Sequence, residues 1–211
     1  PLSTMAKFSD PRVLKRFIIY LGLLTLVMFG VWSVWGTFIE TPAGDFEVRA
    51  GDIHLSSGEY EEAIEDFDRA LELQPDHRGA LMGKAAALIQ LKRYDVAEKV
   101  LTYAIDYLKR TLSPDDPTGR GALAAAYGNR GIVKDTQGRY EQALEDYIES
   151  LKVDADAVEG PGIVDRLLYH DEKPSSIRDR AEYLYKQLQL PEDQRLLRLP
   201  EKDDLQRMHK P

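Results

Sequence analysis

The chain has 211 residues, a net charge of −8 and no cysteine. The lack of cysteine excludes disulfide bonds, thiol catalysis, cysteine-ligated metal sites and a lipidated cysteine in this chain. Residues 1–16 contribute +3 and residues 17–39 contribute no charge, so residues 40–211 carry −11. A domain this acidic lacks the surplus of Lys and Arg that phosphate groups require, and we expect no nucleic-acid partner.

Residues 17–39 contain no charged side chain and follow a basic start. A helix of this length measures about 34 Å, slightly more than the hydrocarbon core of a bilayer. We predict a retained single-pass transmembrane helix rather than a cleaved signal peptide, whose apolar core usually has only about 7–15 residues. The residues expected at its two membrane surfaces are the aromatic Trp32, Trp35 and Phe38 and the basic Lys15 and Arg16.

The distribution of charge around this segment predicts an orientation. Under the positive-inside rule the basic N-terminus lies in the cytoplasm, and the acidic residues after the helix lie on the other side. This predicts a protein of the bacterial inner membrane, or an equivalent, with its C-terminal domain in the periplasm. Residues 40–44 contain Pro and Gly and predict a short linker, which keeps the following domain close to the membrane surface.

A short motif, Gly-x-Tyr-Glu-x-Ala, occurs twice, starting at Gly58 and at Gly138. An aromatic residue follows each Ala after four positions, and a blurred third copy places Tyr94 34 residues after Tyr60. The Gly permits a reversal between helices, and the Ala lets a neighbouring helix approach closely. The pattern predicts repeated helix–turn–helix units.

With this period, the first copy resembles a tetratricopeptide repeat (TPR). The residues that match the family signature are Gly51, Gly58, Tyr60, Ala63, Phe67, Ala70 and Pro75. Glu47 and His54 depart from the Trp and Tyr that the family prefers. The resemblance implies an all-α fold, in which an N-terminal transmembrane helix precedes a TPR-type solenoid of about three repeats with C-terminal capping helices.

The predicted divisions follow in chain order. They are a basic cytoplasmic N-terminus (1–16), the transmembrane helix (17–39), the linker (40–44), repeat one (45–77), repeat two with an extended helix and a loop insertion (78–121), repeat three (122–156), capping helices (157–190) and a C-terminal tail (191–211). Helices are expected near 45–57, 60–73, 95–109 and 163–169, and from Ser175 or Ser176 to about 189, with two short helices in the tail. The insertion is either a binding loop or a tolerated surface loop.

Residues with catalytic or metal-binding potential are sparse. The four histidines, His54, His77, His170 and His209, are far apart and none has a partner at i+4. The chain contains no Gly-rich phosphate loop and no nucleophile motif. We therefore expect no enzyme activity, no cofactor, no bound metal and no small-molecule substrate.

The TPR resemblance implies a concave groove, lined by the first helices of successive repeats, that binds a peptide or a helix. The corresponding residues are Asp45, Val48, Asp52, Leu55, Met82, Ala86, Ile89, Gln90, Ile132 and Asp135. This predicted groove is apolar in its middle and acidic at both ends, which suits an amphipathic or extended segment with some positive charge. The alternative is that the chain's own C-terminal helix fills it. The Lys and Asn pattern with which chaperone-binding TPR proteins hold a terminal carboxylate is missing.

Together these features predict a membrane-anchored TPR scaffold for protein–protein interaction. The preferred function is a structural or assembly subunit of a membrane protein complex, with other protein subunits as partners. The acidity of the domain indicates partners with basic surfaces, or else serves only solubility. The alternative function is a periplasmic chaperone-like TPR protein at the translocon or in cytochrome c biogenesis.

Overall fold

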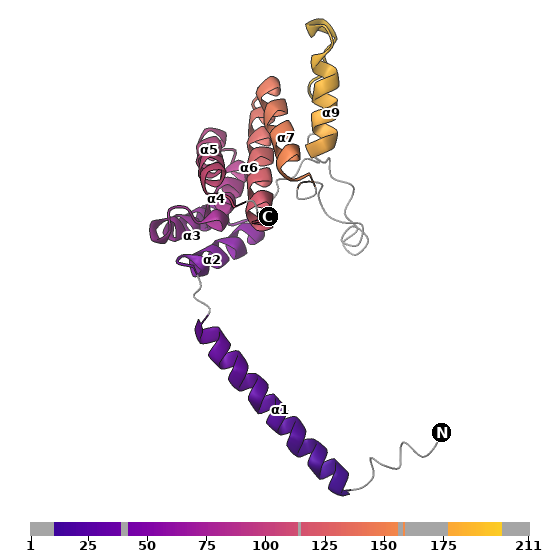
Figure 1. Ribbon diagram of the computed structural model, residues 1–211. Helices are drawn as coiled ribbons and strands as arrows, with labels where there is room; N and C mark the ends of the chain where they lie inside the picture. The colour runs from indigo at the N-terminus through magenta and orange to yellow at the C-terminus, as the bar shows by residue number, and fades with distance from the viewer. Residues whose placement is uncertain (1–10, 39–41, 114, 156–157, 159–176, 200–211) are drawn as a thin grey trace, which may run out of the picture. The chain divides into compact units, whose positions relative to one another are not determined.

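The computed structural model describes residues 11–38, 42–113, 115–155, 158 and 177–199. These residues form α-helices, one 3-10 helix and connecting turns, with no strand among them. The chain divides into two compact units, Pro1–Pro42 and Ala43–Pro211, which are described separately (Figure 1). The described part therefore has the all-α character that the sequence predicts.

The first unit contains α1 (Pro11–Phe38), an unbroken helix of 28 residues. It begins upstream of the predicted transmembrane segment and includes Lys15 and Arg16, because Pro11 is suited to the first position of a helix. At 1.5 Å per residue its length is about 42 Å. Every side chain described in this helix is exposed.

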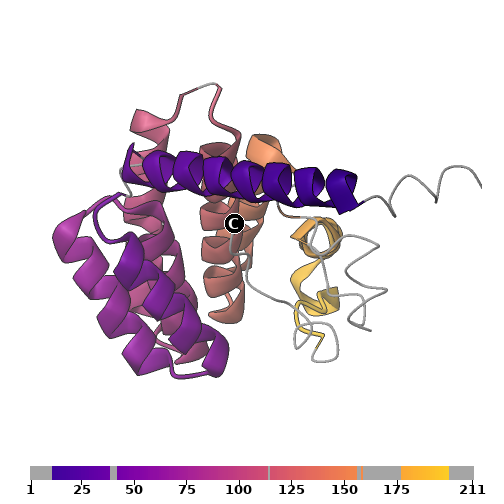
Figure 2. The ribbon, with the colours of Figure 1, turned by 90° about the horizontal axis from the view of Figure 1, so that it is seen from below.

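The second unit is a stack of antiparallel helix pairs, which Figures 1 and 2 show from two directions. Its helices are α2 (Asp45–Ser57), α3 (Tyr60–Leu73), α4 (Arg78–Gln90), α5 (Tyr94–Thr111), α6 (Pro117–Thr136) and α7 (Tyr140–Asp154). Each helix packs against the next one in the chain. Both helices of the first pair have the bounds expected from the sequence.

The turns inside the three pairs share one backbone geometry. Gly58, Lys92 and Gly138 all have positive φ, at 80°, 58° and 78°. In each turn the amide of this residue bonds to the carbonyl three residues earlier, and the following amide bonds to the carbonyl five residues before it. This is the Schellman cap, which favours glycine because a Cβ is strained at positive φ. Lys92 adopts the same conformation although it carries a Cβ.

The motif residues after each turn pack inside the repeats. The rings of Phe67 and Tyr147 are fully buried. A Cβ added to Gly83 would lie 2.3 Å from the Phe67 ring, and one added to Gly131 would lie 2.6 Å from the Tyr147 ring. The buried Ala and the buried aromatic ring of each copy therefore join helices to one another.

The insertion in repeat two mainly lengthens helices. α5 has 18 residues and α6 has 20, compared with 14 in α3 and 13 in α4. The carboxylate of Asp116 accepts the Gly119 amide at 2.7 Å and an Arg78 guanidinium bond at 2.6 Å, and these two contacts hold the pKa of Asp116 below its usual range. Tyr107 donates to Asp76, which raises the pKa of Tyr107 and lowers that of Asp76. The insertion is thus tied to the start of repeat two through Arg78.

The far end of the array carries α9 (Ile177–Leu188), which packs against α7. Ile177, Ala181 and Leu184 are buried at helical spacing, as the sequence predicts for a capping helix. The 3-10 helix η3 (Glu192–Gln194) follows, where the first Pro-Glu start predicted a short α-helix. The helix predicted at 163–169, the Ser175 or Ser176 cap and the second tail helix lie outside the described residues.

Candidate protein-binding surfaces

The packing of the helix pairs gives the array an inner side. The first helices of neighbouring pairs contact one another, α2 with α4 and α4 with α6. No comparable contact joins α3 to α5 or α5 to α7 in the described part of the chain. A stack is concave on the side where its helices lie closer together, so α2, α4 and α6 line the inner side. These are the helices that carry the predicted groove.

Much of the predicted groove is buried between the repeats. The buried members are Val48, Met82, Ala86, Ile132 and Asp135, whereas Asp45, Asp52, Leu55 and Ile89 are half-buried and Gln90 is exposed. Met82, for example, is 2% exposed and belongs to a core cluster with Leu101 and Leu123. A partner can therefore contact only the five less buried residues without repacking the core. Their role in binding stays a prediction.

The third repeat presents its share of the groove to the chain's own α9. The guanidinium of Arg180 donates two hydrogen bonds of 2.7 Å to the two carboxylate oxygens of Asp135, and Tyr147 donates a third bond of 3.0 Å to the same carboxylate. Arg180 is 5% exposed and Asp135 is 4% exposed. Next to this pair, Ile177 packs so tightly on Gly128 that a Cβ there would lie 2.2 Å away. At the third repeat, the chain's own C-terminal helix therefore occupies the predicted groove.

One feature of the sequence could have indicated this contact. Arg180 lies on the same helical face as Ile177, Ala181 and Leu184, which is the face that α9 buries. A charged residue within an apolar face requires a buried partner of opposite charge. Its partner Asp135 lies 45 residues earlier, so sequence spacing alone could not identify it.

The chain after α9 returns to the third repeat. Arg180 donates to the carbonyl of Leu197 at 3.0 Å, and Tyr183 donates to the carbonyl of Leu196 at 2.5 Å. Arg198 then reaches the carbonyl of Thr136 at the last turn of α6, at 2.5 Å. This bond satisfies one of the carbonyls that a helix C-terminus leaves without a partner. The end of the array is therefore covered by both α9 and the segment that follows it.

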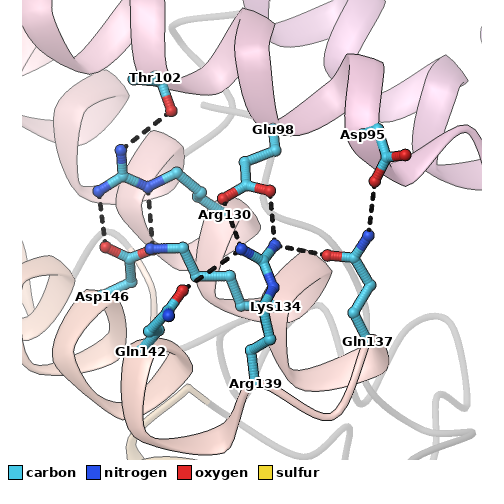
Figure 3. Close-up of polar contacts among 9 residues, drawn as sticks. All are labelled: Asp95, Glu98, Thr102, Arg130, Lys134, Gln137, Arg139, Gln142 and Asp146. Atoms are coloured by element: carbon cyan, nitrogen blue, oxygen red, sulfur yellow. Dashed lines mark hydrogen bonds and ion pairs between the residues drawn. The ribbon is translucent and has the colours of Figure 1, made fainter.

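Long polar side chains bridge the wider space between the second helices (Figure 3). Arg130 donates to both carboxylate oxygens of Asp146, at 2.9 and 2.7 Å, and to the hydroxyl of Thr102 at 3.1 Å. Burial opposes the charge of Arg130, but its hydrogen bonds to Asp146 and the negative charges of Asp146 and Glu98, together with Tyr127, outweigh burial and raise its pKa. Arg139 pairs with Glu98 at 3.0 and 2.5 Å, which raises the pKa of Arg139. Both arginines are structural links between repeats two and three.

A shallow cavity of about 720 Å³ opens along α5 beside these links. Its lining residues are Asp95, Glu98, Lys99, Thr102, Tyr103 and Asp106. Two of the carboxylates have partners in the chain, because Glu98 pairs with Arg139 and Asp95 accepts a bond from Gln137 at 2.9 Å. We assign no ligand to this cavity.

The two histidines in the described part are paired with carboxylates. His54 Nδ1 lies 2.8 Å from Asp66, and His77 Nε2 lies 2.9 Å from Asp45. Each pair joins elements within or next to the first repeat. Among the described residues no group of three or more His, Asp or Glu side chains could hold a metal ion.

The predicted membrane anchor corresponds to α1. Its segment Pro11–Ser33 qualifies as a membrane span by length and composition, and none of the apolar window is buried in the structure. Trp32 is 71% exposed, and Lys15 and Arg16 are exposed in the first turns. Trp35 and Phe38 belong to the end of the same helix, where side chains lie outside the described set.

The helix pairs repeat along the chain, curve toward their first helices and end beneath a capping helix. This arrangement is that of an α-helical repeat scaffold. Its repeats are tetratricopeptide repeats, because family models described as "Tetratricopeptide repeat" match residues 48–117 and 124–156. The predicted TPR solenoid is thereby confirmed. Residues 48–117 and 124–156 of this chain thus consist of tetratricopeptide repeats.

Curated relatives match about half of the chain. RNA polymerase II-associated protein 3 of Xenopus tropicalis is 30% identical over 128 residues, which are 59% of this chain and 17% of the relative. Small glutamine-rich tetratricopeptide repeat-containing protein 2 of Mycosarcoma maydis is 31% identical over 96 residues, which are 46% of this chain and 24% of the relative. The chain therefore spans less than a quarter of each relative's length. Both are named for an association or for their repeats rather than for a reaction.

Solved structures with a similar fold are TPR domains. The Sgt2 TPR domain of Aspergillus fumigatus covers 72% of this chain and 87% of its own, with 20% identity and a TM-score of 0.48. The first TPR of Spaghetti, bound to the HSP90 peptide SRMEEVD, covers 56% of this chain and 84% of its own, with 20% identity and a TM-score of 0.46.

The predicted localisation is wrong in the light of these relatives. They come from frogs and a fungus, which have neither a bacterial inner membrane nor a periplasm, and one is named for its association with RNA polymerase II. The prediction failed because the positive-inside rule orients a helix only within a membrane that is already assumed. Charge around an apolar segment carries no information about the compartment.

Proposed function

We propose that this protein is a single-pass, membrane-held TPR scaffold that binds a segment of another protein on the inner side of its array. In this proposal residues 17–39 anchor the chain, 40–44 link it to three repeats, and α9 with its following segment closes the array. The proposed role is that of a structural or assembly subunit of a membrane protein complex.

The observation that carries the anchor is the exposure of α1 around its whole circumference. Large apolar side chains on every side of the helix, from Val13 at 44% to Leu26 and Trp32 at 71%, have no covering from the described residues of the first unit. Each apolar side chain left in water forgoes about 1.5–3 kcal/mol of burial free energy. A partner helix would cover one stripe, whereas a bilayer covers all sides at once, and a length of about 42 Å suffices to cross it.

The partner segment is defined by the groove residues that stay accessible. Leu55 and Ile89 offer apolar contact, and Asp45, Asp52 and Gln90 offer acceptors. The two basic residues of α4 already have carboxylate partners, since Arg78 pairs with Asp116 and Lys84 pairs with Asp68. These features support a partner with an apolar and basic segment.

The same charges argue against an acidic peptide. The peptide bound to the Spaghetti domain, SRMEEVD, contains three acidic residues and one basic residue. Next to Asp45 and Asp52 such a peptide would meet like charges, which weakens association. We expect no saturable binding of this peptide to the protein by isothermal calorimetry, and a micromolar Kd would identify an adaptor for HSP90-type tails instead.

The proposal is tested on the full chain expressed in its own cell type. An anchored chain is expected to float with membranes in a density gradient. It should still do so after the membranes have been washed with alkaline carbonate. Purification in a mild detergent, followed by mass spectrometry, should then return one complex in stoichiometric amount. Many substoichiometric proteins would favour a chaperone-like role, and a chain that stays at the bottom of the gradient would refute the anchor.

A further inference from the structure

The first end of the repeat array carries an exposed apolar strip on α2. Phe46 is 78% exposed and Ile53 is 65% exposed, and they lie two helical turns apart on the same face. Arg49, which is exposed, and the half-buried Ala50 share this face. The face lies opposite Val48, which packs into the core. We call Phe46, Arg49, Ala50 and Ile53 the outer strip of α2.

The two ends of the array differ in what covers them. Repeat arrays need terminal elements because an end repeat otherwise leaves an apolar face in water. α9 covers the last repeat through the buried Arg180–Asp135 pair. Within the described residues of the second unit, no corresponding helix covers the outer strip of α2. The outer strip is therefore open to an occupant that the described residues do not supply.

The covalent chain limits how far α2 can lie from the end of α1. Only residues 39–44 connect Phe38 to Asp45, and even a fully extended chain of this length reaches no more than about 25 Å. Gly44 is fixed to the array as well, since a Cβ on it would lie 2.9 Å from the carbonyl oxygen of Ala70. If α1 crosses a bilayer, as proposed above, α2 begins within reach of the headgroups.

The charge of the outer strip differs from that of the rest of the domain. Residues 40–211 carry −11, yet the only charged member of the strip is Arg49. The acids of α2 lie to the sides of the strip, and one of them, Asp45, pairs with His77. Anionic lipids repel an acidic domain over most of its surface and attract a basic residue flanked by apolar side chains.

We propose that the outer strip of α2 lies on the lipid surface, with Phe46 and Ile53 at the boundary between headgroups and acyl chains and Arg49 at the phosphates. This contact covers the open end of the array and holds the first repeat against the bilayer. It rests on the proposed anchoring by α1. A second copy of the chain on the same strip is the competing occupant.

The natural absence of cysteine makes the test direct. Single variants Phe46→Cys and Ile53→Cys in the full chain are labelled with an environment-sensitive NBD dye and reconstituted into vesicles of phosphatidylcholine and phosphatidylglycerol at 7:3. The matched control is Val96→Cys on α5, an apolar site of 46% exposure. Lipids with a spin label in the upper acyl chain are expected to quench the dye at positions 46 and 53 at least twofold more than at position 96.

Each other outcome has a definite meaning. Vesicles that float with the protein while all three positions are quenched equally would overturn the contact and leave the anchor intact. Energy transfer between labels at position 46 of different copies, without lipid quenching, would also overturn it in favour of a dimer. Protein that does not float with the vesicles would refute the anchor itself, and with it the contact.

Discussion

Removal of the Arg180 guanidinium should detach the capping helix. The Arg180→Ala substitution deletes both bonds to Asp135 and the bond to the Leu197 carbonyl. It leaves a carboxylate that is 4% exposed with Tyr147 as its remaining side-chain donor in the structure. Breaking a buried ion pair by removing one partner typically costs about 3–5 kcal/mol.

The expected loss is about 3 kcal/mol, at the lower end of that range. The cost has a ceiling, because α9 can leave the array and let water reach Asp135 once the penalty exceeds the free energy that holds the helix in place. At about 1.4 kcal/mol per factor of ten, this loss raises the opening constant of α9 roughly a hundredfold.

Hydrogen exchange followed by mass spectrometry measures this opening directly. Amides in Ile177–Leu188 should exchange roughly a hundredfold faster in Arg180→Ala, while those of α2 and α3 stay unchanged. Glu182→Ala, at an exposed position of the same helix, is the matched control and should change exchange by less than threefold. If Arg180→Ala behaves like Glu182→Ala, the pair does not hold the cap and the reasoning fails.

Three further predictions concern the repeats. Lys92→Gly relieves positive φ at 58° and should stabilise the fold by about 0.5–1 kcal/mol in thermal unfolding, whereas Lys99→Gly, at an exposed position inside α5, should destabilise it by about 1 kcal/mol. Met82→Glu places a charge at a site 2% exposed and should abolish the cooperative helical transition, whereas the exposed Val96→Glu should not; an unchanged transition for Met82→Glu would make this site surface rather than core. Asp116 has a lowered pKa, so the stability that it contributes is present above its unfolded value of 3.8 and lost as the pH falls through its folded value. The difference in melting temperature between the wild type and Asp116→Asn should therefore be present at pH 7 and shrink as the pH falls below 3.8, and a difference that stays constant on acidification would contradict the assignment.

The helices could be predicted from sequence because their ends depend on local chemistry. Gly58 supplies the positive φ that a Schellman cap requires, and Pro75 stops the helix that Tyr60 begins, so these boundaries need no information from distant residues. α9 was predicted from its own periodicity in the same way.

The surface could not be predicted as well because burial depends on distant residues. Met82 occupies a groove position of the TPR pattern, but residues of α5 and α6 cover it. Asp135 was expected to face a partner and instead binds Arg180, which belongs to a helix outside the repeats. The prediction of the compartment failed for a third reason. Apolar length and flanking charge describe a segment of the chain and carry no information about the cell that contains it.

The measurement that tests the central claim most directly compares partner retention between two variants of equal charge change. Asp52→Lys with Gln90→Lys reverses the charge of the accessible groove, and Glu62→Lys with Thr111→Lys makes the same change at exposed sites on the second helices. The full-length proteins are purified in mild detergent and the stoichiometric partner is quantified by mass spectrometry. The account predicts at least a tenfold loss of partner for the groove variant and wild-type retention for the control. Equal retention by both would contradict a binding site on the inner side of the array.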